Sequence, residues 1–271
     1  MKRSTLSHRG MWILSATITA IAFAVACGGD ETRSRKAIRG GGGGDAPKTG
    51  APTAATGTLK KLDPANAGTI SGVVKFDGVA PPPKPIDLTP ECSKIVTEQA
   101  FEDTLVVKDG KVEYAFLYLD VKDSYEPSAE TVTIDQKGCH YRPHVMGLQA
   151  GQKFEIKSSD PFLHNAHYIG KVNGENNLAM SKPSSRVVTF EAEDGMLKFK
   201  CDVHPFMGAW VGIMTHPFFA TSASDGTYTI KNVPPGEYDL VMHHEKLGEQ
   251  RTKVKVETGK TATADFTLKM K

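Results

Sequence analysis

The chain of 271 residues contains 39% hydrophobic and 24% charged residues, a balance typical of a globular protein rather than a helical membrane bundle or an acidic disordered chain. Its formal net charge is +2, but residues 67–271 alone contain 23 Lys/Arg and 27 Asp/Glu, a net charge of −4. A nucleic-acid-binding protein needs a concentrated basic face, so no nucleic-acid partner is expected.

The first residues of the chain have the pattern of an export signal. Three basic residues precede a sixteen-residue apolar run, residues 11–26, which is shorter than the ~20 residues of a membrane-spanning helix. We therefore predict a signal peptide at residues 1–26. The stretch Ala24-Val25-Ala26-Cys27 resembles a bacterial lipobox, in which the cysteine is acylated and becomes the new N-terminus. An ordinary signal cleaved at the same stretch is the alternative to lipidation of Cys27.

Residues 27–66 are predicted to form a linker. The segment contains a five-glycine run at 40–44 and is rich in Pro, Thr, Ala and Lys, with almost no large apolar residue. Such a segment cannot bury enough surface to offset its chain entropy, so it is expected to act as a flexible spacer. An anchor at Cys27 followed by this spacer predicts a protein tethered to a membrane of the bacterial envelope, on its periplasmic side or at the cell surface.

Short stretches of alternating apolar and polar residues, separated by Gly, Pro, Asp and Asn, fill the rest of the chain. This period-two pattern predicts an all-β fold built from β-sandwiches. The predicted strands include residues 70–76, 112–119, 131–135, 153–157, 186–191, 198–201, 209–215, 228–230, 238–240, 253–257 and 264–268. One helix is predicted, over residues 89–100, because Thr89-Pro90-Glu91 suits a helix N-terminus.

The segment 201–207 contains the clearest chemical motif of the chain. It reads Cys201-Asp202-Val203-His204-Pro205-Phe206-Met207 and follows a predicted strand, so one turn can bring a thiolate, an imidazole and a thioether to a single point. Soft sulfur donors beside imidazole favour copper, and two histidines with one cysteine and a weak axial methionine are the ligands of blue-copper electron-transfer sites. This segment supplies only one of the two histidines.

Together with an upstream His164-Asn165-Ala166-His167 segment, this motif resembles the cupredoxins, which are plastocyanin-like blue copper proteins, and most closely their amicyanin branch. In that branch the cysteine, the second histidine and the methionine also lie three residues apart. The resemblance implies a Greek-key β-sandwich over residues 126–216 that binds one copper ion. It implies His164, Cys201 and His204 as strong ligands, Met207 as the axial ligand, and Asn165 as a residue that holds the two ligand segments together near the Cys201 sulfur.

Other readings of these residues remain open at this stage. His167 competes with His164, although positions three apart on a strand face opposite sides. His140, His144 and His216 are unassigned. One of them could approach the metal, and His144 is the first candidate. Zinc accepts Cys and His, but methionine is a poor zinc ligand. The chain lacks the nucleophile-elbow, phosphate-loop and HExxH patterns, so no enzyme activity is expected.

The four cysteines can be assigned by elimination. If Cys27 carries lipid and Cys201 binds copper, Cys92 and Cys139 remain, and in an exported protein such a pair is predicted to form a disulfide. Two buried free thiols are the alternative.

The C-terminal residues 217–271 resemble a carboxypeptidase-regulatory-like domain, a small transthyretin-like β-sandwich. The resemblance is carried by Asp225-Gly226-x-Tyr228 and by Pro234-Pro235-Gly236-x-Tyr238. The usual first strand, with a Ser-Gly-x-Val pattern, is missing there but occurs at Ser71-Gly72-Val73-Val74. Residues 67–125 are therefore expected to complete this sandwich, with the cupredoxin-like unit inserted between its halves; tandem domains are the simpler alternative. The neighbouring His243 and His244 are a weaker metal candidate.

Taken together, these patterns predict an exported, lipid-anchored protein with one type 1 copper ion. It would carry single electrons between redox partners such as a cytochrome c or a dehydrogenase. A copper-delivery module for metal homeostasis is the first alternative, and an adhesive β-sandwich without redox function is the second.

Overall fold

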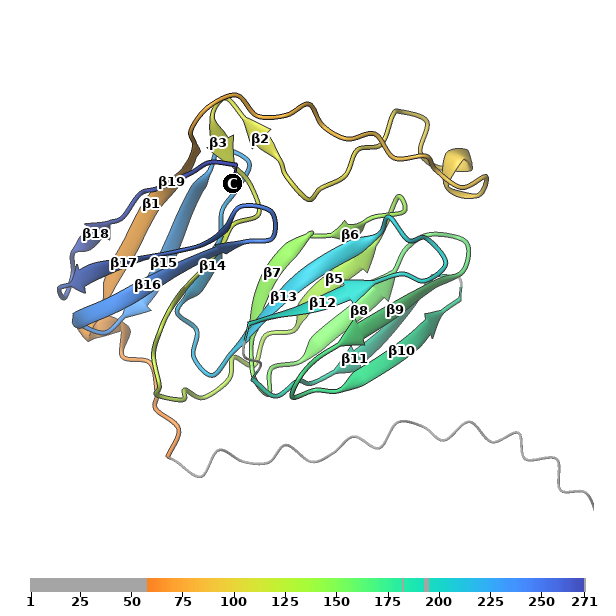
Figure 1. Ribbon diagram of the computed structural model, residues 1–271. Helices are drawn as coiled ribbons and strands as arrows, with labels where there is room; N and C mark the ends of the chain where they lie inside the picture. Colours follow the sequence, from red (N-terminus) through yellow and green to blue (C-terminus); the bar gives the residue numbers. More distant parts are fainter. Residues whose placement is uncertain (1–57, 182, 193–194, 271) are drawn as a thin grey trace, which may run out of the picture. The chain divides into compact units, whose positions relative to one another are not determined.

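The computed structural model describes residues 58–181, 183–192 and 195–270. The predicted signal peptide, Cys27 and the linker up to residue 57 lie outside the described residues. The described chain is all-β, as predicted, and its only helices are the short 3₁₀ turns η1 (Pro64–Asn66) and η2 (Cys92–Lys94) (Figure 1). Within these residues, no helix is both long and apolar enough to cross a membrane.

Nine strands between residues 132 and 214 form a two-sheet unit (Figure 1). They are β5 (Val132–Gln136), β6 (Tyr141–Arg142), β7 (Val145–Gln149), β8 (Phe154–Ser158), β9 (His164–Ile169), β10 (Glu175–Met180), β11 (Ser184–Val188), β12 (Met196–Lys200) and β13 (Gly208–Met214). One sheet has the order β10-β9-β12-β13-β7, and the other has the order β11-β8-β5-β6. Parallel pairing of β13 with β7 and of β5 with β8 shows that the strands cross between hairpins rather than forming a simple meander.

The core of this unit is aromatic at its centre. Phe199, which is fully buried on β12, lies with its ring centroid 6.0 Å from Phe154 and 5.4 Å from Tyr168. Alternate residues of β8, Phe154 and Ile156, point into the same core, as the period-two pattern requires. This packing fixes the end of β12, from which Cys201 extends.

Ten further strands form the second unit, called here the regulatory-like module. They are β1 (Gly68–Phe76), β2 (Val107–Lys108), β3 (Lys111–Val112), β4 (Phe116–Leu119), β14 (Phe219–Thr221), β15 (Thr227–Val233), β16 (Gly236–His244), β17 (Gly248–Val256), β18 (Thr261–Thr263) and β19 (Phe266–Leu268). Strand β1 pairs with β15, β18 and β19, and β4 pairs with β14 and β16. Strands that precede and follow the two-sheet unit in sequence thus share the same sheets.

Two glycines allow side chains of the module to pack on strands β7 and β13. Gly147 and Gly212 are register partners on these strands. A Cβ atom at Gly212 would lie 2.3 Å from ring carbons of Phe116, and one at Gly147 would lie 2.5 Å from a ring carbon of Phe219. Only glycine accepts such a close approach, so this contact depends on both residues.

The predicted helix at residues 89–100 is wrong, because only η2 forms within it. Of this segment only Cys92 and Ala100 are buried, so a longer helix would have no apolar stripe to pack. The predicted strand 112–119 is divided between β3 and β4, since Tyr114 between them has a positive φ of 65°. Seven strands are additional to those that the pattern predicts, namely β2, β6, β7, β9, β10, β14 and β18.

Candidate metal centre

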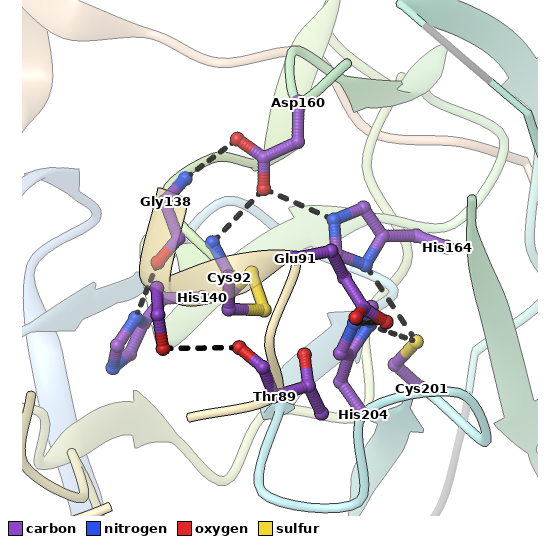
Figure 2. The surroundings of a disulfide bond; sticks show 11 residues. Thr89, Glu91, Cys92, Gly138, His140, Asp160, His164, Cys201 and His204 are labelled. Atoms are coloured by element: carbon purple, nitrogen blue, oxygen red, sulfur yellow. Dashed lines mark hydrogen bonds and ion pairs between the residues drawn. A yellow bond between two sulfur atoms is a disulfide. The ribbon is translucent and has the colours of Figure 1, made fainter. Parts of the chain in front are cut away.

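Three buried side chains bring their donor atoms together at one end of the two-sheet unit (Figure 2). His164 is the first residue of β9, Cys201 directly follows β12, and His204 lies in the turn between β12 and β13. The Cys201 Sγ atom is 3.8 Å from Nδ1 of His164 and 3.7 Å from Nδ1 of His204. Both imidazoles are fully buried and present the same ring nitrogen to the sulfur.

These distances suit a metal ion. A metal–sulfur bond of about 2.3 Å and a metal–nitrogen bond of about 2.0 Å, at a trigonal or tetrahedral angle, place the two donor atoms roughly 3.5–3.7 Å apart. The two observed distances from Cys201 Sγ, 3.8 Å to His164 Nδ1 and 3.7 Å to His204 Nδ1, lie at the upper end of this range or just above it. One thiolate with two imidazoles is also the donor set that suits copper. The residues therefore fit the ion that the sequence predicts.

The turn that carries His204 is closed by main-chain hydrogen bonds. The Cys201 N–H donates to the Met207 carbonyl at 3.2 Å, and the Met207 N–H donates to the His204 carbonyl at 2.8 Å. Pairing of Lys200 with Gly208 across β12 and β13 fixes both ends of this turn. Met207, which the sequence predicts as the axial ligand, is 1% exposed, so its side chain lies inside the protein.

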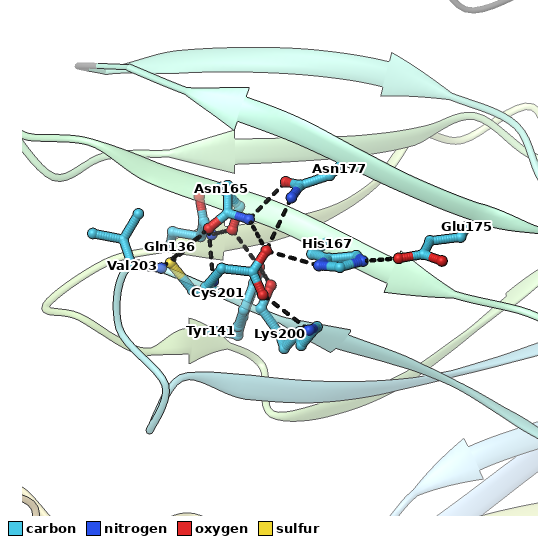
Figure 3. Close-up of polar contacts among 10 residues, drawn as sticks. Gln136, Tyr141, Asn165, His167, Glu175, Asn177, Lys200, Cys201 and Val203 are labelled. Atoms are coloured by element: carbon cyan, nitrogen blue, oxygen red, sulfur yellow. Dashed lines mark hydrogen bonds and ion pairs between the residues drawn. The ribbon is translucent and has the colours of Figure 1, made fainter.

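Asn165 joins β9 to the cysteine segment (Figure 3). Its Oδ1 atom accepts hydrogen bonds from the Cys201 Sγ at 3.3 Å and from the main-chain N–H of Asp202 at 2.8 Å. Its Nδ2 donates to Asp202 at 2.9 Å and to Asn177 on β10 at 2.6 Å. The side chain thus occupies the position between the two ligand segments that the family resemblance implies.

The three donors differ in how their surroundings shift their pKa values. Burial raises the pKa of Cys201, but hydrogen bonds from His164 and from main-chain N–H groups outweigh it and lower the pKa. Burial lowers the pKa of His164, yet hydrogen bonds with Asp160 and Cys201 prevail and raise it to about 9. Burial and the neighbouring His164 charge lower the pKa of His204. The metal-free site thus holds one charged and one neutral imidazole beside a cysteine whose pKa is lowered.

Both histidines are supported from behind by carboxylates (Figure 2). Asp160 accepts from His164 Nε2 at 3.0 Å and also from the main-chain N–H groups of Gly138 and Cys139. His204 Nε2 lies 3.5 Å from a Glu91 oxygen and makes no hydrogen bond among the described atoms. Asp160 and Glu91 are the site residues that sequence reasoning did not single out; Asp160, four residues before His164, was the one with a local signal.

Cys92 and Cys139 form a disulfide in the structure. Cys139 lies next to Asp160 through its N–H, and Cys92 follows Glu91 directly. Sulfur atoms of both cysteines are within 4.8 Å of a ring nitrogen of His204. The disulfide therefore fastens the segment around η2 over the second histidine.

The remaining histidines make contacts away from this centre. His167 lies on β9 between two carboxylates, with Nδ1 2.7 Å from Asp202 and Nε2 2.7 Å from Glu175 (Figure 3). His144 contacts the Gly208 carbonyl and Glu245. The other four, His140, His216, His243 and His244, are likewise outside every group of closely spaced donor atoms found among the described residues.

Comparison with known proteins gives two results. Residues 205–269 match the carboxypeptidase regulatory-like domain. Solved amicyanin structures also match: the protein from Paracoccus versutus (Thiobacillus versutus) is 20% identical, with 36% of this chain and 96% of that chain covered and a TM-score of 0.28. A reduced amicyanin variant is 22% identical, with 36% and 97% covered and a TM-score of 0.28. No curated protein matches the chain.

The family match confirms the resemblance of the C-terminal residues to the carboxypeptidase-regulatory-like domain. The identities and TM-scores of the amicyanin matches are too low to carry an inference about function. We therefore infer function from the side chains of the centre.

Proposed function

We propose that this chain is an exported type 1 copper protein that carries single electrons and binds one copper ion. His164, Cys201 and His204 would be the strong ligands and Met207 the axial ligand. The observation that carries the proposal is the convergence of one thiol and two imidazole Nδ1 atoms, all buried, at metal-spanning distances.

The enclosure of the site favours electron transfer over copper delivery and over catalysis. Delivery needs ligands that a partner can reach, whereas both histidines are 0% exposed and the cysteine is 1% exposed. A catalytic metal keeps an open position for substrate, and here the three donors and Met207 are packed within the core. A buried, rigidly held ligand set suits an ion that gains and loses one electron with little rearrangement.

The chain's own residues would prepare the site. Copper supplies the one-electron chemistry when bound. Asp160 orients His164 through Nε2, which leaves Nδ1 directed at the thiolate. The raised pKa of His164 means that its Nδ1 proton is released when a metal binds there, so copper affinity is expected to rise with pH. Asn165 holds the sulfur and the following main chain in place.

We also propose where the protein works. Residues 1–26 would direct export, acylated Cys27 would anchor the chain to a membrane of the bacterial envelope, and the segment up to residue 66 would act as its spacer. The electron partner would be another redox protein of the envelope, such as a cytochrome c or a dehydrogenase. The sequence patterns alone support these assignments.

The test is titration of the purified chain with Cu(II), using Cys27→Ser to prevent lipidation. We expect one copper per chain and an intense thiolate-to-copper absorption band that disappears in Cys201→Ser. Met207→Leu should alter the band, whereas Met146→Leu, which changes a buried methionine elsewhere in the same core, should leave it unchanged. A chain that binds no copper, or binds it without this band, would contradict the proposal.

A further inference from the structure

His144, between β6 and β7, uses both ring nitrogens in contacts that have no part in the metal centre. Its Nδ1 lies 2.9 Å from the carbonyl oxygen of Gly208, and its Nε2 lies 2.5 Å from Oε1 of Glu245. A carbonyl oxygen only accepts, so Nδ1 donates to Gly208. The side chain is 6% exposed, and with both nitrogens engaged it has no donor atom left for copper.

Glu245 comes from the regulatory-like module, directly after β16. Burial raises its pKa, but hydrogen bonds from His144 and the Trp210 indole outweigh this effect and keep the pKa below its usual value. The carboxylate is therefore ionised at neutral pH and 15% exposed. The Glu245 carboxylate thus binds two side chains of the two-sheet unit, those of His144 and Trp210. Charge-assisted hydrogen bonds of this kind are shorter and roughly twice as strong as neutral ones.

The two side chains that Glu245 contacts, His144 and Trp210, both lie at the start of β13: His144 contacts Gly208, and Trp210 belongs to the strand. Gly208 is the first residue of that strand and directly follows Met207. The Trp210 N–H donates to the His144 carbonyl at 2.9 Å, so the main chain of His144 holds the same strand that its ring contacts. The ring of Tyr114, also from the module, lies edge-on to His144 at 5.4 Å. Together these contacts fix the first residues of β13, which directly follow Met207.

We propose that Glu245, His144 and the Gly208 carbonyl form a clamp through which the regulatory-like module positions Met207 and so tunes the reduction potential of the copper centre. The inference rests on the proposed function. Axial-ligand position is one of the main determinants of potential in such sites. A looser Met207 donates less electron density, which destabilises Cu(II) more than Cu(I) and raises the potential. His144 and Glu245 are thus positioning residues and not ligands.

The experiment compares four forms of the copper-loaded chain: wild type, Glu245→Gln, His144→Leu and the double variant. Glu249→Gln is the matched control, since Glu249 also lies on the module but is exposed and pairs with Arg251. We expect each clamp variant to keep one copper and its absorption band. Each should favour Cu(I) about tenfold more than wild type, which corresponds to about 59 mV for a one-electron couple. The double variant should add no further shift.

The sign of the shifts separates the clamp from simple electrostatics. Loss of the Glu245 charge alone would raise the potential in Glu245→Gln, but it would not raise it in His144→Leu, which keeps that carboxylate. The clamp predicts a rise in both. Opposite signs, additive shifts or an unchanged potential in Glu245→Gln would overturn the inference while leaving the copper site established. A wild-type chain without the copper band would instead overturn the proposed function.

A second measurement uses the copper-free protein. Amide resonances of Met207 and Gly208 should move in Glu245→Gln and stay in place in Glu249→Gln. Unmoved resonances in a folded Glu245→Gln protein would show that the module does not hold this peptide. This readout remains valid even if His144→Leu fails to fold.

Discussion

Gly212→Ala is expected to disrupt the packing of the module on strand β13. The new Cβ atom would lie 2.3 Å from two ring carbons of Phe116, a distance that requires something to move. Phe116 is fully buried, and its ring contacts those of Tyr118 and Phe219 at centroid distances of 5.8 and 5.9 Å. The ring therefore has little room to yield, and overpacking of this kind costs about 1–3 kcal/mol.

We expect Gly212→Ala to lower the free energy of unfolding of the copper-free chain by about 2 kcal/mol. For a protein of this size that corresponds to a fall in Tm of roughly 4–8 °C. Urea unfolding followed by circular dichroism gives the free energy directly. Gly208→Ala on the same strand is the control, because its Cβ would meet nothing closer than a carbonyl oxygen at 3.5 Å.

A double-mutant cycle identifies the cause. Phe116→Leu removes the ring carbons that the new methyl group would meet, so Gly212→Ala should cost less than about 0.5 kcal/mol in that background, within the error of additivity. An equal cost in both backgrounds would show that the glycine matters for a reason other than the Phe116 ring. A cost no larger than that of Gly208→Ala would refute the reasoning altogether.

Three further predictions concern pH, the disulfide and Asn165. Burial lowers the pKa of His216 to about 4, so the unfolded chain, with an ordinary pKa near 6.5, takes up its proton first as the pH falls. The low pKa of His216 should therefore reduce the free energy of unfolding by about 3 kcal/mol as the pH falls from 6.5 to 4. In His216→Gln the free energy of unfolding, measured with urea, should depend less on pH in this range; the same pH dependence in both proteins would contradict the prediction. Cys92→Ser with Cys139→Ser opens a loop of 47 residues' separation and should cost about 4 kcal/mol, and a cost under about 1 kcal/mol would exclude the disulfide as a main constraint. Asn165→Ala leaves the N–H of Asp202 without its acceptor and should lower copper-free stability by about 1–3 kcal/mol, whereas an unchanged urea midpoint would show that the contact is dispensable.

The ligand turn is the part of the centre that sequence predicts best. Cys201, His204 and Met207 lie within a single turn, so their spacing alone indicates that they meet. His164 is distant in sequence and was placed only through the family resemblance. Glu91 contacts His204 although more than a hundred residues separate them in sequence, and no local sequence pattern predicts such a partner.

The fold shows the same division. Period-two alternation finds strands such as β8, where alternate residues are buried. It does not find β9, whose first five residues are all buried, because His164, Asn165 and His167 are polar and burial there does not follow an apolar–polar alternation. The helix expected at 89–100 was suggested by its first residues, but a local start signal does not supply an apolar face for packing.

The ends of the two-sheet unit lie side by side. The Tyr125 N–H donates to the Thr215 carbonyl at 2.8 Å, and a few residues further on β4 pairs with β14. The chain therefore leaves the module and re-enters it at almost the same point, and the entropy of closing a loop depends only weakly on its length. The regulatory-like module therefore accepts an insertion at this point. A short turn, or a different domain whose termini are adjacent, can replace the two-sheet unit between Tyr125 and Thr215 without changing how the strands of the module pair.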